Sequence, residues 1–133
     1  MTRRFRFGVQ GRGTPSGDEW TAFARRAEAL GFDVLLLPDH FSGDHSVMPA
    51  LAAASAVTER IRLSPFVVSN DFRHPALLAK EAATIDRLSG GRFELGIGAG
   101  WMQSEYDHLG VLHNEPGNAS AVRFRTRSGW SGR

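Results

Sequence analysis

The chain contains no cysteine among its 133 residues, which excludes a disulfide framework and any zinc site with cysteine ligands. No apolar run approaches the ~20 residues that cross a bilayer. The arginines near the N-terminus are not followed by the apolar segment of a signal peptide. From these absences we expect a soluble, cytoplasmic protein that does not bind membranes.

Acidic residues are missing from one end of the chain. Sixteen basic residues stand against fourteen acidic ones, for a net charge of +2. Four of the arginines follow Val122, where no acidic residue occurs, so residues 1–122 carry twelve basic and fourteen acidic residues. This body has no surplus positive charge to attract phosphate groups, and a nucleic-acid partner is therefore not expected.

Four apolar segments have the character of β-strands, and a chain of this length can bury them in one core. Residues 5–10 alternate between apolar and other side chains, as a strand does. Residues 34–37 are uniformly apolar, which is typical of a strand buried on both faces. Residues 61–68 and 93–97 are the third and fourth predicted strands.

Helical patterns separate these strands. Ser16 and Glu19 have capping-box spacing, apolar residues follow at helical intervals up to residue 30, and Gly31 offers a left-handed stop. Residues 49–57, with Pro49 in the first turn, and residues 75–88 predict two further helices, and 102–109 a short one.

Strands about thirty residues apart, joined by helices, predict an α/β fold with a parallel sheet. A doubly wound sheet and part of a (β/α)8 barrel both fit, and four βα units are half of a barrel that needs ~250 residues. We place a partial barrel at residues 1–111. Residues 112–133 show neither the helical nor the strand periodicity of apolar residues, and they are expected to form a disordered, arginine-rich tail.

In parallel βα folds the active site forms at the C-terminal ends of the strands. Residues 10–13, 39–41, 69–74 and 98–101 follow the four predicted strands and share this end. The turn at residues 89–92 precedes a strand, so we expect it at the opposite end, where it contributes to stability.

His40, next to Asp39, is the best candidate for acid–base chemistry. Histidine titrates near physiological pH, and a neighbouring carboxylate can orient or charge it. The alternative is a loop histidine that binds a backbone group. His45 also follows an aspartate, but no third ligand stands at a familiar spacing, so no metal site is expected.

Three glycines, Gly96, Gly98 and Gly100, alternate at the end of the fourth predicted strand. Glycine there lets backbone N–H groups approach a ring or a phosphate, although the pattern is not the G-x-G-x-x-G fingerprint. Close packing of the chain explains the same pattern equally well.

Six segments in this order resemble the luciferase-like monooxygenase superfamily, and in particular its oxidoreductases that use the deazaflavin coenzyme F420. The resemblance runs from about residue 5 to about residue 117. The segments are residues 5–10, 27–33, 38–41, 58–63, 72–80 and 86–101, with Glu105, Tyr106 and Gly110 following as in many members.

The resemblance implies the N-terminal half of a (β/α)8 TIM barrel and hydride transfer between coenzyme F420 and a small organic substrate. An FMN-dependent monooxygenase of the same fold and a non-catalytic remnant are the alternatives, and family members can form homodimers. The resemblance places Asp39 and His40 beside the cofactor ring, with His40 handling the substrate proton. It also implies a non-prolyl cis peptide at Phe66–Val67. The residues implied to line the cofactor are Phe66, Val67, Ser69, Asn70, Gly98, Ala99 and Gly100.

The chain departs from the family pattern in two places. Trp101 stands where some deazaflavin dehydrogenases have an acidic residue. After residue 117 the family continues into further βα units, whereas this chain enters its arginine-rich segment, as a frameshift or a truncated reading frame would produce. Four strands alone leave inner faces and two sheet edges uncovered. We therefore expect the isolated chain to be aggregated, oligomeric or partly molten, and to lack oxidoreductase activity.

Overall fold

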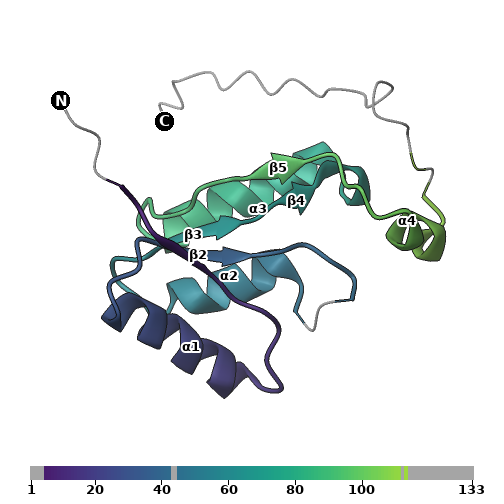
Figure 1. Cartoon of the computed structure of the whole chain (residues 1–133). Coiled ribbons are helices and arrows are strands. Elements are labelled where there is room, and N and C mark those ends of the chain that lie inside the picture. The colour runs from purple at the N-terminus through teal and green to yellow at the C-terminus, as the bar shows by residue number, and fades with distance from the viewer. Residues whose placement is uncertain (1–4, 43–44, 112, 114–133) are drawn as a thin grey trace, which may run out of the picture.

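The computed structural model describes residues 5–42, 45–111 and 113, so nearly all of the predicted tail lies outside the described residues. Strands and helices alternate along the chain (Figure 1). None of the described helices is both long and apolar enough to pass through a membrane. The elements are β1 (Gly8–Gln10), α1 (Gly17–Ala29), β2 (Val34–Leu37), α2 (Val47–Ser55), β3 (Arg62–Pro65), β4 (Val68–Ser69), the 3-10 helix η1 (Asn70–Phe72), α3 (Pro75–Leu88), β5 (Ile97–Gly98) and α4 (Gln103–Leu109).

The strands are parallel, as the alternation of strands and helices predicts. β1, β2 and β3 pair in that order, with Leu35 opposite both Val9 and Leu63. A bridge between Leu63 and Phe93 extends the sheet to the segment that precedes β5, and β4 pairs with β5. The described chain is thus a parallel sheet of four successive βα strands, with β3 and β4 forming the third.

The prediction of one continuous third strand over residues 61–68 is wrong. A cis peptide bond between Phe66 and Val67 separates β3 from β4, and this bond is the one that the family resemblance implied. Leu63 pairs with Phe93, but Val68 pairs with Ile97, so the third strand has one more residue than its neighbour over this stretch. The extra residue forms a β-bulge at the C-terminal end of the strand.

Other predicted bounds differ less. β2 and α3 have the predicted bounds, whereas α2 begins and ends two residues before the prediction. The first strand begins at Gly8 rather than at residue 5, since its ladder with β2 starts there. The fourth strand was predicted at residues 93–97, but only a bridge at Phe93 and the pair Ile97–Gly98 form, because its partner strand is interrupted by the bulge.

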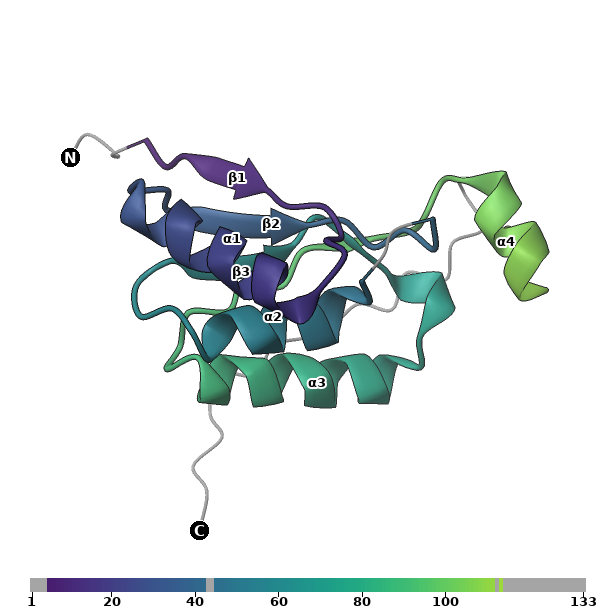
Figure 2. The same cartoon turned by 90° about the horizontal axis from the view of Figure 1, so that it is seen from below.

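Three helices, α1, α2 and α3, cover one face of the sheet (Figure 2). The Ser16 hydroxyl accepts a hydrogen bond from the Glu19 backbone N–H at 3.2 Å, as expected for the start of α1. Gly31, with φ of +85°, ends the helix, and the Phe32 N–H returns to the Ala27 carbonyl at 3.2 Å. This arrangement is the Schellman motif, and it directs the chain from α1 into β2.

The core lies between the sheet and these helices. The Trp20 indole N–H donates to the Ala50 carbonyl at 2.8 Å, which fixes α1 against α2. Burial of each large aliphatic side chain contributes ~1.5–3 kcal/mol, so this layer is the main source of stability. The core consists of Trp20, Ala24, Ala27, Leu35, Leu37, Val47, Met48, Ala50, Leu51, Ala54, Ile61, Leu63, Val68, Leu78, Ile85 and Phe93.

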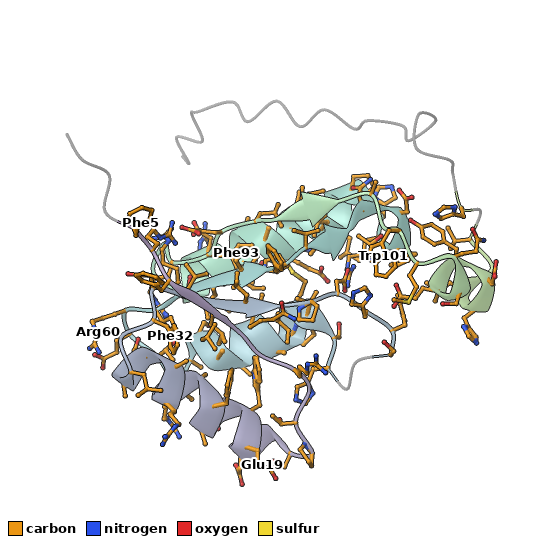
Figure 3. The ribbon with its side chains drawn as sticks, in the orientation of Figure 1. Phe5, Glu19, Phe32, Arg60, Phe93 and Trp101 are labelled. Carbon is orange, nitrogen blue, oxygen red and sulfur yellow. The ribbon has the colours of Figure 1, made fainter. Side chains whose placement is uncertain are left out.

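The turn at residues 89–92 lies at the N-terminal end of the strands, as predicted. The Arg92 guanidinium donates to the Ile61 carbonyl at 2.9 Å, directly before β3, and to the Ser55 carbonyl at 3.0 Å, at the end of α2. Figure 3 shows Arg60 and Phe5 at this end, and Trp101 at the opposite end. Arg92 therefore ties this turn to α2 and β3 at the end of the sheet opposite Trp101.

Candidate functional site

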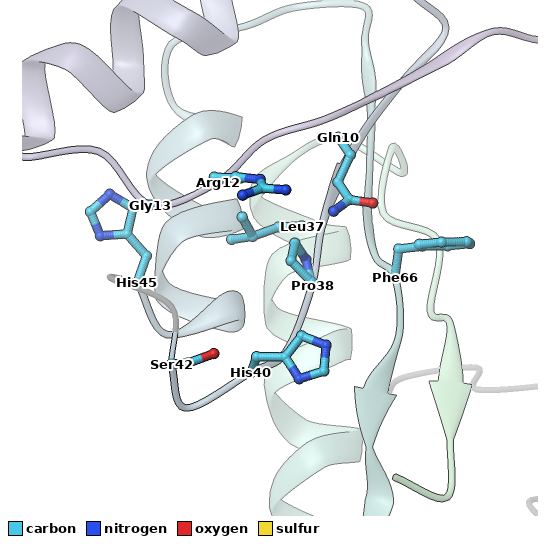
Figure 4. A pocket seen from close by; sticks show the side chains of 9 residues that line it. All are labelled: Gln10, Arg12, Gly13, Leu37, Pro38, His40, Ser42, His45 and Phe66. Carbon is cyan, nitrogen blue, oxygen red and sulfur yellow. The ribbon is translucent and has the colours of Figure 1, made fainter. Parts of the chain in front are cut away.

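The chain segments that follow the strands meet around two cavities that share His40 and Phe66. The larger cavity, of about 580 Å³, extends toward the end of β1 (Figure 4). The smaller, of about 130 Å³, lies over the ends of β4 and β5. The larger cavity is lined by Gln10, Arg12, Gly13, Leu37, Pro38, His40, Ser42, His45 and Phe66. The smaller is lined by Asp39, His40, Phe66, Val67, Ser69, Phe72, Gly100, Trp101 and Glu105.

Of the nine site residues proposed from the sequence, six line the smaller cavity. Asn70, Gly98 and Ala99 do not line either cavity, although Asn70 follows Ser69 and Ala99 precedes Gly100, both of which line the smaller one. His45 lines the larger cavity, and its Nε2 accepts a hydrogen bond from the Thr14 backbone N–H at 3.2 Å. No group of three His, Asp or Glu side chains with the geometry of a metal site occurs in residues 5–42 and 45–111.

Glu105 is the carboxylate that holds His40. Its two oxygens lie 3.2 and 3.3 Å from His40 Nδ1, and Oε1 also accepts the Phe41 backbone N–H at 2.8 Å. The Glu105 residue is only 7% exposed. A carboxylate withdrawn from water and bonded to Nδ1 fixes the orientation of the imidazole. Sequence reasoning assigned this orienting role to Asp39, and that assignment is wrong.

Asp39 instead connects two loops. Its Oδ1 accepts from Arg73 Nη2 at 2.7 Å, Oδ2 pairs with Arg73 Nη1, and Oδ2 also accepts the Ser69 backbone N–H at 3.0 Å. The two side chains are 7% and 16% exposed, so this bidentate pair is largely shielded from solvent. Both oxygens of Asp39 are occupied, and its contacts hold the loop after β2 against the segment that begins in β4.

Tyr106 connects the next two segments. Its hydroxyl lies 2.6 Å from the Ala99 carbonyl and 3.0 Å from Asp71 Oδ2. Burial raises the pKa of Tyr106, and the hydrogen bond with Asp71 raises it further. The phenol therefore remains protonated and serves as a hydrogen-bond donor. Its ring packs against Phe72, with 4.9 Å between the ring centroids.

The alternating glycines permit close packing around the bulge. A Cβ at Gly96 would lie 2.6 Å from the Pro65 carbonyl oxygen, and one at Gly98 would lie 2.6 Å from Val67 Cγ2. Gly100 has φ of +72°, and its Cβ would lie 2.2 Å from the Tyr106 hydroxyl oxygen. These contacts account for glycine at all three positions, and a direct contact with a cofactor stays a prediction.

The wall of the smaller cavity combines apolar surface with hydrogen-bonding groups. Phe66 and Val67 are 58% and 41% exposed, and the Trp101 ring stands edge-on to His40 at 6.1 Å. Within the described residues, the buried Asn70 Oδ1 has no hydrogen-bond partner. The Ser69 side chain hydrogen-bonds with Tyr106, so Asn70 Oδ1, adjacent in sequence to the cavity lining but not part of it, is the clearer unsatisfied acceptor. Exposed apolar side chains beside an unpaired polar atom fit a flat, polar-edged ring.

Sequence reasoning missed the residues that hold the others in place, namely Arg73, Glu105 and Tyr106. Arg73 stands in the segment at residues 69–74, which was already assigned to the functional end of the sheet. Glu105 and Tyr106 were noted only for their resemblance to the family. The sequence signal that could have identified these three residues was a charged or hydroxyl-bearing side chain near a strand end. Their hydrogen-bond partners depend on tertiary contacts and could not be predicted from that signal.

A parallel βα sheet with its polar cavity at the C-terminal strand ends is the arrangement of an enzyme built on a (β/α)8 barrel. The sequence profile of one family, the luciferase-like monooxygenases, matches residues 3–121. The chain belongs to this family, whose members are oxidoreductases and monooxygenases.

Three proteins illustrate the relationship. The 4-hydroxyprotoasukamycin monooxygenase of Streptomyces nodosus subsp. asukaensis is 36% identical over 88 residues, covering 63% of this chain and 24% of that protein. The coenzyme F420-dependent tetrahydromethanopterin reductase of Methanopyrus kandleri matches in structure with a TM-score of 0.72 and 30% identity, covering 79% of this chain and 30% of that one. The oxygenating constituent of 3,6-diketocamphane monooxygenase from Pseudomonas putida, solved with FMN, matches with a TM-score of 0.69 and 25% identity. The match covers 80% of this chain and 33% of that one.

The chain therefore spans a third or less of the length of these three proteins. It matches the portion of a TIM barrel that contains successive parallel strands and helices. Both F420-dependent and FMN-containing proteins are among the matches.

Proposed function

We propose that residues 5–111 form the cofactor-facing part of an oxidoreductase that transfers a hydride between coenzyme F420 and a small organic substrate. His40 is the residue that exchanges a proton with that substrate. The observation that carries the proposal is the position of His40, which lines both cavities while Glu105 holds its Nδ1 at 3.2 Å.

The cavity wall supports a ring-shaped cofactor. Phe66, Val67 and Trp101 offer exposed apolar surface, and Ser69, which lines the cavity, is followed by Asn70, whose buried Oδ1 has no partner within the described residues. Coenzyme F420, when bound, supplies a ring that accepts or donates a hydride. Phe66 and Val67 would contact the face of such a ring, and Ser69 and Asn70 would contact its polar edge.

The two carboxylates have different roles in this proposal. Because Glu105 binds Nδ1, His40 Nε2 is the nitrogen that takes the proton of a substrate hydroxyl as a hydride leaves the carbon, or returns it in the reverse direction. Asp39 is a positioning residue, since Arg73 and Ser69 occupy its oxygens and keep the His40 loop in place.

The choice of F420 over FMN rests on the resemblance of residues 5–117 to the deazaflavin-using branch. The similarity to the F420-dependent reductase, at 30% identity, supports it. An FMN-dependent monooxygenase is the second candidate, because the structure solved with FMN matches over 80% of this chain.

Two chimeras test the choice of cofactor, since a complete site needs more of the barrel than this chain contains. In one, residues 1–111 replace the matching segment of the Methanopyrus kandleri reductase. In the other, they replace that of the Pseudomonas putida enzyme. We expect both chimeras to bind F420 more tightly than FMN in fluorescence titrations. Tighter FMN binding by both chimeras would refute the F420 proposal. So would a result in which each chimera prefers the cofactor of the enzyme that supplies the rest of its barrel.

The role of His40 is tested in the chimera that binds F420. We expect His40→Gln to lower kcat by ~10²–10⁴-fold, the usual contribution of a general acid or base, with F420 affinity changed less than threefold. Asn70→Ala should do the reverse and weaken F420 binding more than it lowers kcat. His108→Gln, at an exposed position on α4, is the matched control. A His40→Gln chimera with unchanged kcat would return His40 to a structural role.

A further inference from the structure

The loop after β1 begins as a continuation of that strand. The Gly11 N–H donates to the Leu36 carbonyl at 2.8 Å, beside the ladder that joins β1 to β2. A Cβ on Gly11 would lie 2.7 Å from the Trp20 ring, so this residue faces α1 and the helix layer. Side chains of an extended segment alternate between its two faces. Gln10 and Arg12 therefore point away from the helices, and both line the larger cavity.

Arg12 supplies the one permanent charge in the described lining of this cavity. The residue is exposed, and neither aspartate nor glutamate is among the described residues that line the cavity with it. The smaller cavity differs, because Asp39 and Glu105 are part of its wall. Those two carboxylates are already occupied, by Arg73 and by His40 respectively. Within the described part of the chain, the larger cavity thus has a positive charge that no lining carboxylate balances.

Other polar groups of the larger cavity are hydrogen-bond donors as well. Because the Thr14 backbone N–H donates to His45 Nε2, the neutral His45 ring carries its proton on Nδ1. The Gln10 amide and the Ser42 hydroxyl also line the cavity, and both can donate. A cavity with a guanidinium and several further donors is suited to an anionic group.

A single arginine matches a carboxylate better than a phosphate ester. The planar guanidinium fork binds the two oxygens of a carboxylate side by side. One positive charge also balances a carboxylate, whereas a phosphate monoester carries nearly two negative charges at neutral pH. Figure 4 shows Arg12 and His40 on opposite sides of Pro38 in the wall of the cavity of about 580 Å³. One small molecule in this cavity can therefore contact both side chains.

We propose, on the basis of the function proposed above, that the substrate is a small hydroxy acid or the corresponding oxo acid, and that Arg12 binds its carboxylate. The hydroxy acid loses its hydroxyl proton to His40 Nε2 and a hydride to F420, and this two-electron oxidation gives the oxo acid. Arg12 holds the other end of the molecule, which orients the hydroxyl toward His40.

The test compares hydroxy acids with their neutral amides, which have nearly the same shape. Lactate, β-hydroxybutyrate and γ-hydroxybutyrate differ in the spacing between hydroxyl and carboxylate. Their dissociation constants and those of the amides are measured by ligand-observed NMR on the Methanopyrus kandleri chimera, with and without F420. We expect at least one acid to bind at least ~tenfold more tightly than its amide, because a hydrogen bond to a charged group contributes that much.

Substitutions of arginine identify the side chain responsible. Arg12→Gln should remove the preference for the acid and leave F420 affinity unchanged. Arg12→Lys keeps the charge without the planar fork, and it should keep part of the preference. Arg25→Gln removes the same charge from an exposed position on α1, so this matched control should keep the whole preference.

Four results would overturn the proposal. One is equal binding of every acid and its amide, and another is a preference for the acid that survives in Arg12→Gln. The third is tighter binding of glycerol phosphate than of all the acids, which would make phosphate the preferred anion. The fourth is a loss of F420 affinity in Arg12→Gln, which would assign Arg12 to an anionic part of the cofactor.

Failure of the proposed function gives a different result. It would appear as tighter binding of FMN, or as an unchanged kcat in His40→Gln. Binding of the acids requires no turnover, so the contribution of Arg12 is measured independently of both results.

Discussion

Replacement of Arg92 by lysine should lower the free energy of unfolding by more than replacement of any exposed arginine by lysine. The Arg92 guanidinium uses all five of its N–H groups. Nε donates to the Ser89 carbonyl at 2.7 Å, Nη1 to the Thr58 hydroxyl at 3.0 Å and the Ile61 carbonyl at 2.9 Å. Nη2 donates to the carbonyls of Ser55 and Thr58, each at 3.0 Å. Through these hydrogen bonds, the Arg92 side chain connects the end of α2 and the start of β3 to the turn before the fourth strand.

The magnitude follows from the number of acceptors that lysine cannot reach. An ammonium group has three N–H donors on one nitrogen, whereas the guanidinium fork reaches acceptors on several sides. At least two carbonyls therefore lose their partner. Hydrogen bonds to a charged group contribute ~1.5–3 kcal/mol each, and water at this half-buried position offsets part of the loss. We expect a decrease of about 2–4 kcal/mol in the free energy of unfolding.

Urea denaturation followed by circular dichroism measures this change. With a slope of ~1–3 kcal/mol/M, the midpoint of Arg92→Lys should fall by roughly 1–3 M. All samples must have the same chain concentration, because self-association would make the measured stability depend on concentration. Arg87→Lys, at an exposed position on α3, is the matched control and should change stability by less than ~0.5 kcal/mol. An Arg92→Lys chain no less stable than this control would refute the reasoning.

Two further substitutions test contacts at opposite ends of the sheet. Burial raises the pKa of Glu28, but hydrogen bonds from the backbone N–H groups of residues 61, 60 and 59 lower it by more, so the folded-state pKa lies below the ordinary 4.5. Glu28→Gln should therefore cost about 1–2 kcal/mol in urea denaturation at pH 7. The difference from the unsubstituted chain should be complete above pH 4.5 and vanish as the pH falls through the lowered folded-state pKa; a pH-independent difference would contradict this. Gly100→Ala combines a φ of +72° with a Cβ 2.2 Å from the Tyr106 hydroxyl oxygen, so it should lower the free energy of unfolding by at least ~2 kcal/mol. Gly17→Ala, with open space around its Cβ, is its control and should be neutral or slightly stabilising, and equal effects of the two would exclude the proposed clash.

Much of the fold could be predicted from local patterns. The uniformly apolar segment at residues 34–37 became β2, and the helix at residues 75–88 has the predicted bounds. The predictions failed where pairing with a neighbour decides the structure. The bulge at Phe66–Val67 splits the third strand, and the interruption leaves the fourth strand only partly paired.

In the candidate site, too, the local sequence predicted the position of residues along the strands but not their contacts with distant residues. The order of strands and loops was enough to place His40, Ser69 and Gly100 at one end of the sheet, and all three line one cavity. The sequence did not reveal which carboxylate serves His40, because adjacency favoured Asp39 over Glu105, which is 65 residues away.

The sequence by itself determined the alternation of strands and helices, the end of the sheet that carries the candidate site, and the family, because periodicity, strand order and motifs can be read from the local chain. The tertiary structure alone decided that Asp39 pairs with Arg73 and that Glu105 binds His40. It also decided that the alternating glycines pack against the bulge. These contacts join residues far apart in sequence, and the distance between two such side chains depends on how the strands pack, which no local pattern encodes.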